Sequence, residues 1–170
     1  MTTNDPVDPI AFEKEAHARV ESVDPDVDLD TMSAVFNMLR VVNRLLHDLD
    51  THVYRPHGLT WAGFRVLFSL WVEPGSPPAR LATLSGVSRA TISSVLNTLE
   101  RNGLVRRTKE STDRRVVTVA ITPAGERVVR DVFLAQHGRE RAWLEDLDPA
   151  EIATLNGILR SLLDRPAPER

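Results

Sequence analysis

The run RLATLSGVSRATISSVLNTLERNGLVRRTKESTDRRVVTVAITPAG, residues 80–125, constrains the fold more than any other part of the chain. Apolar residues recur in it at helical spacing before Gly86 and again after Ser88, a residue type that favours a helix N-cap. Two runs rich in β-branched residues, residues 104–108 and 116–121, then flank a polar turn. The pattern predicts a short helix, a turn, a second helix and a two-stranded hairpin, which is a helix-turn-helix with a wing.

The second helix of this motif has one apolar face and one small, polar and positive face. The apolar stripe consists of Ile92, Val95, Leu96 and Leu99. Residues that can enter a DNA groove and form hydrogen bonds with base edges are Arg89, Thr91, Ser94 and Asn97. Arginine suits guanine and asparagine suits adenine, each through paired hydrogen bonds. Ser88 is either a plain helix cap or also a phosphate contact.

Basic residues are concentrated in this motif, although the chain of 170 residues carries a net charge of −3. Residues 80–130 hold ten Lys and Arg against four Asp and Glu, whereas residues 1–30 hold two against nine. A local basic patch is expected for a surface that binds the phosphate backbone, and an ordinary solvated surface is the alternative. On the hairpin, the candidates for phosphate contacts are Arg106, Arg107, Lys109 and Arg114.

This segment resembles the DNA-binding core of the MarR (multiple antibiotic resistance regulator) family of transcriptional regulators. The resemblance lies in the run SRATISSVLNTLERNGLVRR, in Asp113-Arg114-Arg115 at the wing tip and in the ITPAG exit into a helix. It implies that Arg115 reaches into a minor groove and that Asp113, which is also a turn former, pairs with it. The resemblance further implies a two-fold dimer that binds a palindromic operator in double-stranded DNA.

Around the winged core, predicted as residues 59–122, the chain is expected to be mainly α-helical. Residues 1–29 form an N-terminal extension that is partly disordered or contains one short helix. Residues 30–58 form a long apolar helix, residues 123–165 form two C-terminal helices, and residues 166–170 are a tail. The long helices are too apolar to be covered by so small a core. We therefore expect a homodimer, with a monomer capped by helices as the alternative.

In the family that this chain resembles, small molecules bind between the dimerisation helices and the winged domain. The resemblance therefore implies a ligand site with a lining of Phe36, Arg40, Asn43, His47, Trp61, Phe64, Arg65 and Phe68. Aromatic walls with one or two arginines suit an apolar body with an anionic end, such as an aromatic acid or its coenzyme A thioester. The alternative is that these aromatic residues are simply core.

Several other classes of site find no support in the sequence. The chain has no cysteine, so disulfides and cysteine-ligated zinc are excluded, which fits the reducing cytoplasm. We expect no membrane segment and no signal peptide, because no apolar run reaches about 18 residues. His47, His52 and His57 are spaced five apart and do not share a helical face, so they predict no metal site. No catalytic motif and no cofactor motif is present.

These patterns and the family resemblance together predict a cytoplasmic transcriptional regulator that is not an enzyme. We expect it to repress transcription rather than to activate it. A bound ligand would favour a spacing of the two recognition helices that no longer matches the operator. Two other classes are open. One is a winged-helix module for protein contacts that binds no operator. The other is an enzyme with an appended winged dimerisation domain, for which the helices after the wing leave little room.

Overall fold

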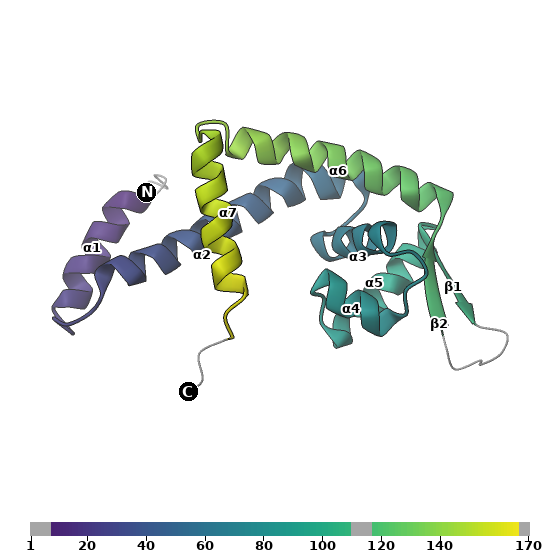
Figure 1. Cartoon of the computed structure of the whole chain (residues 1–170), viewed down its shortest axis with the longest axis horizontal. Coiled ribbons are helices and arrows are strands. Elements are labelled where there is room, and N and C mark those ends of the chain that lie inside the picture. Colours follow the sequence, from purple (N-terminus) through teal and green to yellow (C-terminus); the bar gives the residue numbers. More distant parts are fainter. Residues whose placement is uncertain (1–7, 110–116, 167–170) are drawn as a thin grey trace, which may run out of the picture. The chain divides into compact units, whose positions relative to one another are not determined.

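A computed structural model of the chain describes residues 8–109 and 117–166 (Figure 1). The described residues form helices and a two-stranded antiparallel sheet, which confirms the predicted fold class. The chain divides into two compact units, Met1–Leu45 and Leu46–Arg170. No helix in the described ranges is both long enough and apolar enough to span a membrane.

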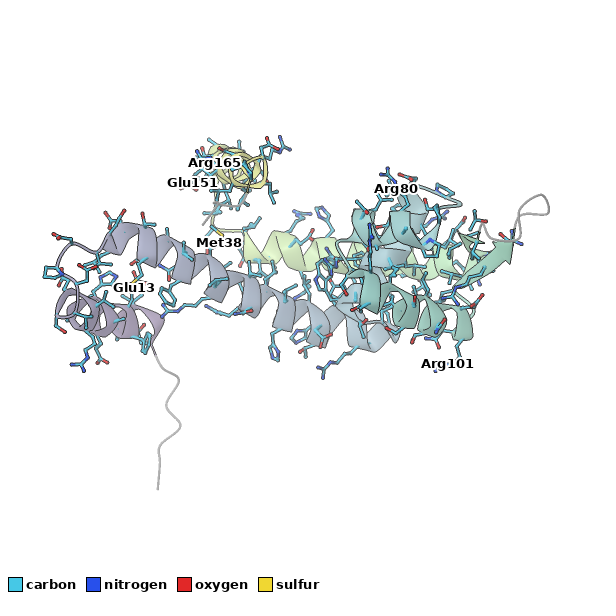
Figure 2. The ribbon with its side chains drawn as sticks, turned by 90° about the horizontal axis from the view of Figure 1, so that it is seen from below. Glu13, Met38, Arg80, Arg101, Glu151 and Arg165 are labelled. Carbon is cyan, nitrogen blue, oxygen red and sulfur yellow. The ribbon has the colours of Figure 1, made fainter. Side chains whose placement is uncertain are left out.

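The first unit consists of α1 (Pro9–Glu21) and most of α2 (Leu29–Leu49). Glu13 of α1 faces α2 (Figure 2), and its carboxylate lies 3.7 Å from Arg40 Nη1. The Arg40 guanidinium also lies over the ring of Phe12, 5.4 Å from its centroid, where the ring's negative face attracts a cation. Within the described part of residues 1–29, the chain forms the helix α1.

The second unit begins inside α2 and contains the winged core (Figure 1). Its further elements are a π-helical turn (Asp50–Tyr54), a 3-10 turn (Arg55–His57), α3 (Trp61–Val72), α4 (Pro78–Ser85), α5 (Arg89–Arg101), β1 (Val105–Lys109), β2 (Val117–Ile121), α6 (Pro123–Trp143) and α7 (Pro149–Leu163). The turn before α3 ends at Gly58, whose φ of 69° is left-handed. Glycine adopts this conformation without a steric cost and commonly ends helices for that reason.

Side chains cap three helices of the second unit, including α5 at Ser88, where the sequence predicted a cap. Ser88 Oγ accepts a hydrogen bond from the backbone N–H of Thr91 at 3.1 Å, which opens α5. Thr122 Oγ1 accepts one from the N–H of Gly125 at 3.0 Å, which opens α6. Asp148 opens α7 through a reciprocal capping box. Each cap satisfies backbone donors that the first turn of a helix leaves unpaired, so these sequence signals set the helix starts.

The hairpin packs on the helices as a short wing. Its strands pair antiparallel from Val105↔Ile121 to Lys109↔Val117. The described strands therefore lie within one residue of the predicted runs. The backbone N–H of Val119 donates to the carbonyl of Ser76 at 3.0 Å, so the loop before α4 covers the outer edge of β2.

The core of the second unit draws on every helix from α3 to α6 and on the wing. Its apolar side chains with no solvent exposure are Val66, Leu67, Leu70, Leu81, Leu96, Val119, Val129 and Val132. Burial of these residues is the main favourable contribution to folding. It holds α5 and the wing in one rigid block, which is the part of the fold that presents the candidate site.

Gly125 permits the closest approach between α6 and the wing. A Cβ atom on this residue would lie 2.1 Å from the carbonyl oxygen of Leu104 and 2.8 Å from Ile121 Cγ1. Beside it, Thr122 Oγ1 accepts the cap bond and donates to the carbonyl of Gly103 at 2.7 Å. The start of α6 is therefore locked onto the end of α5 and the start of β1, and only glycine fits there.

We expect Gly125→Ala to lower the free energy of unfolding by at least about 2 kcal/mol, because the new methyl group overlaps a backbone oxygen that cannot move freely. The matched control is Gly138→Ala in the same helix, where a Cβ would meet nothing within 4 Å. That change should raise the free energy of unfolding by about 0.5–1 kcal/mol. Urea denaturation measures both, and equal stability of the two variants would contradict the close approach.

Asp48, near the end of α2, joins that end to the last turns of α6. Its carboxylate accepts hydrogen bonds from the guanidinium of Arg139, with Nε at 2.9 Å, and from Trp143 Nε1 at 2.9 Å. His52 Nδ1 lies 2.9 Å from the same carboxylate. The bonds from Arg139 are the largest cause that lowers the pKa of Asp48 from 3.8 to about 2, and those from Trp143 add to it against the opposing effect of burial.

Because the pKa of Asp48 is lower in the folded state, its contribution to stability is present above pH 3.8 and is lost as the pH falls toward 2. We expect Asp48→Asn to lower the free energy of unfolding by about 1–2 kcal/mol at neutral pH, since it removes a charge-assisted pair. Urea midpoints should be measured from pH 6 to pH 2.5. The difference in midpoint between wild type and variant should become smaller below pH 4. A gap that stays constant over this range would mean that the carboxylate charge contributes nothing.

Candidate nucleic-acid interface and ligand pocket

α4 and α5 form the helix-turn-helix of the second unit. α4 ends at Gly86, whose φ of 61° is left-handed, and Val87 turns into the core with 6% of its surface exposed. Ser88 then caps α5. The connection between α4 and α5 is tight, because a left-handed glycine, a buried valine and a helix cap follow one another directly. The orientation of α5 is therefore set by its own sequence and by the core.

One face of α5 is buried and the other is open to solvent. Ile92, Leu96 and Leu99 are each no more than 4% exposed. The residues predicted to contact DNA from this helix and its cap are all exposed: Ser88, Arg89, Thr91, Ser94 and Asn97. Arg101, at the other end of the helix, is exposed as well (Figure 2). The structure thus brings the predicted base-reading residues onto one accessible surface.

Local hydrogen bonds occupy part of this surface. The hydroxyl oxygens of Ser88 and Thr91 lie 2.8 Å apart. Ser94 Oγ donates to the carbonyl of Thr91 at 2.8 Å, so the proton of this hydroxyl is engaged within the helix. Its lone pairs remain available, and Ser94 is therefore arranged to accept a hydrogen bond from an incoming group.

Of the two arginines predicted to contact phosphate from β1, Arg107 has partners within the protein. Its Nη1 donates to Asn97 Oδ1 at 2.7 Å and to Glu100 Oε2 at 3.1 Å. Arg106, the neighbouring residue on the strand, has an exposed side chain. Sequence reasoning missed the contact between Arg107 and Asn97, because the two residues belong to different elements and no local pattern joins them.

The remaining predicted wing contacts lie outside the described residues. They are Asp113, Arg114 and Arg115, together with the side chain of Lys109. The strands that lead to them are described, and Thr108 and Thr118 join these strands through hydroxyl oxygens 2.9 Å apart. The roles of these wing residues therefore stay predictions from the sequence.

A cavity of about 220 Å³ lies among α3, α4 and α6. Its lining residues are Trp61, Phe64, Arg65, Phe68, Ser69, Leu84, Ser85, Phe133 and Gln136. Four of them were predicted from the sequence: Trp61, Phe64, Arg65 and Phe68. Ser69 lies on α3 with them. The other four could not be predicted, because tertiary packing alone brings α4 and α6 to this place.

The polar side chains of this cavity have partners, with one exception. Ser69 Oγ and Ser85 Oγ donate to carbonyls of their own helices, at 2.8 and 2.5 Å. Gln136 accepts from Tyr54 Oη at 2.9 Å. Arg65 Nε, by contrast, is buried without a hydrogen-bond acceptor among the described residues. Because buried donors are almost always paired, this N–H group is the polar feature of the cavity that needs an acceptor.

The aromatic walls of the cavity are also continuous with the core. The ring of Phe68 stacks on that of Phe133 with centroids 5.9 Å apart, and Phe64 is only 4% exposed. The Arg65 guanidinium lies over the ring of Trp61, 5.0 Å from its centroid. The same rings therefore pack the core and line the cavity, and their role in ligand binding stays a prediction from the sequence.

The other residues predicted for a ligand site lie elsewhere in the described structure. Phe36 and Arg40 line a cavity of about 30 Å³ beside α1, within the first unit. Asn43 and His47 are exposed on α2. In the described ranges, no group of three or more His, Cys, Asp or Glu side chains is arranged to hold a metal ion.

Comparison with known proteins agrees with this architecture. A family model described as MarR family matches residues 59–117. The uncharacterised HTH-type transcriptional regulator YwaE of Bacillus subtilis is 32% identical over 138 residues, which cover 81% of each chain.

Two solved structures share the fold. BpsR of Bordetella bronchiseptica, whose DNA binding is regulated by 6-hydroxynicotinic acid, is 23% identical with a TM-score of 0.71, over 78% of this chain and 99% of that one. CouR of Rhodococcus jostii RHA1, bound to p-coumaroyl-CoA, is 23% identical with a TM-score of 0.68, over 80% and 95% of the two chains. The winged helix-turn-helix and the similarity to YwaE along most of both chains lead to one conclusion: this protein belongs to the MarR family of DNA-binding transcriptional regulators.

Proposed function

We propose that this protein is a repressor that binds a palindromic operator as a homodimer and is released from it by a small aromatic anion. The observation that supports operator binding most directly is the exposed face of α5. Arg89, Thr91, Ser94 and Asn97 are accessible there, while the opposite face of the same helix is buried. A helix anchored in this way can enter a major groove without losing its packing.

A second copy of the chain would cover apolar surface that is otherwise in water. In the first unit, α2 exposes Phe36 at 52% and Leu39 at 55%. In the second unit, α7 exposes Ile158 at 55% and Leu163 at 83%. Several large apolar side chains exposed on one helix typically mark an interface, and an isologous dimer is the commonest way to cover them. Dimerisation would also pair two copies of α5 for half-sites about one helical turn apart.

The wing contributes a minor-groove contact in this proposal. Arg115 would enter the groove and Asp113 would orient it, as the resemblance to the family implies. A narrow minor groove concentrates negative potential, so a cation inserted there gains more than one on the outer surface of the DNA.

Arg65 supports an anionic effector in the cavity among α3, α4 and α6. Its buried Nε–H group lacks an acceptor, and its guanidinium is stacked on Trp61. A carboxylate would supply that acceptor, and the surrounding rings would cover an aromatic body. The compound that regulates DNA binding by BpsR is an aromatic acid with a carboxylate, whereas the thioester bound to CouR has no free carboxylate at its acyl end. A cavity of about 220 Å³ is smaller than most drug-sized sites, which favours a single-ring acid over a thioester.

The cavity also suggests how the effector would act on DNA binding. Leu84 and Ser85 come from α4, the first helix of the helix-turn-helix, whereas Phe133 and Gln136 come from α6. A ligand between them would favour one separation of these helices over another and would thereby change the spacing of the two α5 helices in the dimer. The ligand can shift the equilibrium between two such spacings only as far as its affinities for them differ.

Fluorescence anisotropy with the DNA upstream of the protein's own gene tests operator binding at two salt concentrations. We expect tight binding that weakens steeply with salt. Arg89→Ala should weaken binding to this DNA about tenfold, because a paired contact with a base is lost, with little effect on random DNA. The control is Arg19→Ala on α1, which is also exposed and should bind like wild type. Binding no tighter than that to random DNA would favour a protein-interaction module instead.

Titration of the same complex with benzoate, 6-hydroxynicotinate and aromatic coenzyme A thioesters tests the effector. Arg65→Met should still bind the DNA but should need at least about tenfold more of the releasing acid, since it lacks the charged donor. The corresponding neutral amides should release wild-type protein poorly. If the acid no longer released Arg40→Met from the DNA but still released Arg65→Met, the effector would bind beside α1 instead.

A further inference from the structure

Arg101, the last residue of α5, lies on the same exposed face as residues that are proposed to contact bases. Around the helix axis it lies about 20° from Ser94 and about 40° from Asn97, because successive residues turn by about 100°. All three side chains are exposed, and Arg101 can be followed in Figure 2. The face that Arg89 begins at one end of α5 therefore ends in a second arginine at the other.

The positive charge of Arg101 is not balanced within the part of the chain that the structure describes. No hydrogen bond or ion pair joins its guanidinium to another described side chain. Arg107 on β1 differs, because its Nη1 lies 3.1 Å from Glu100 Oε2 and the two charges offset one another. A phosphate beside Arg101 would replace no pair within the protein, so the full charge is available to an anion.

An arginine at this place also has an ordinary structural role. The C-terminal end of a helix is the negative end of its dipole, which favours a cation in the last turn. Arg19 occupies the last turn of α1 in the same way. Because α1 belongs to the first unit and the helix-turn-helix to the second, Arg19 shows what a cation at a helix end contributes by itself.

The length of α5 would place Arg101 beyond the bases when the first turn of the helix lies on them. From Arg89 to Arg101 the helix rises about 18 Å, whereas the major groove is about 12 Å wide. The recognition helix of a helix-turn-helix contacts base edges with its N-terminal residues. Since the groove winds around the duplex and the helix is straight, the C-terminal end would lie beside the phosphates that border the groove.

We propose that Arg101 binds a backbone phosphate at the C-terminal end of the recognition helix. Contacts of this kind fix the register of a protein on the duplex but carry no sequence information directly. Arg101 therefore adds affinity for DNA of any sequence and is distinct from the contacts predicted from the sequence. The proposal rests on the proposed function to the extent that α5 must lie in the major groove.

The test measures binding of the full-length protein by fluorescence anisotropy at several salt concentrations, on DNA enriched from a random pool and on random DNA. Arg101→Met should reduce the slope of log K against log salt by about 0.9 for each chain that binds. It should weaken binding to both DNAs by a similar factor, about tenfold for a dimer. Arg101→Lys keeps the charge and should keep the wild-type slope.

Arg19→Met is the matched control, since it removes a cation from the end of a helix that carries no DNA contact. It should bind both DNAs like wild type, and thermal melting should show similar small shifts in Tm for Arg19→Met and Arg101→Met. A wild-type slope and affinity in Arg101→Met would overturn the inference and leave the arginine a helix-end residue. A changed preference at one base pair with an unchanged slope would also overturn it, because Arg101 would then contact a base.

Failure of the proposed function would give a different result. Wild-type protein that showed no salt-dependent binding to either DNA would refute operator binding itself, and the inference about Arg101 with it.

Discussion

One face of α5 is buried in the core of the second unit, and this burial fixes the orientation of the helix. Leu96 and Leu99 are anchored among α3, α4 and the wing, so the helix can neither rotate nor withdraw without exposing the core. Its opposite face is consequently presented to solvent in a fixed orientation. The close approach at Gly125 ties α6 to the same block, and the loop at Ser76 covers the edge of the wing. The winged core is therefore one rigid block. The helices that would pair it with a second copy of the chain, by contrast, expose apolar side chains.

Two arrangements of side chains bear on how the winged core would act. The cavity around Arg65 is walled by α4 on one side and α6 on the other, so its occupant would touch both the winged core and the helix that leaves it. In the second arrangement, Arg107 of β1 forms hydrogen bonds with Glu100 and Asn97 and so joins the wing to α5. Under the proposed function, the first arrangement would govern whether the protein stays on DNA.

Features that depend on local chemistry could be predicted from the sequence. Ser88 and Thr122 cap their helices because a hydroxyl reaches the first free N–H groups, and this needs no knowledge of distant residues. The helix-turn-helix and the wing followed from spacing in the same way. Contacts between distant elements could not be predicted: Phe133 reaches the cavity from α6, and Arg107 reaches Asn97 from the wing. The expected ligand lining was therefore only half assembled, with Phe36 and Arg40 beside α1 instead.

Under the proposed function, two copies of α5 bind one DNA site together. Hydroxyl-radical footprinting of the wild-type protein, on DNA that it has enriched from a random pool, shows whether they do. We expect two protected blocks on one face of the duplex, related by two-fold symmetry and centred about one helical turn, roughly 10 base pairs, apart. A single block without symmetry, or protection spread evenly over any DNA, would contradict it.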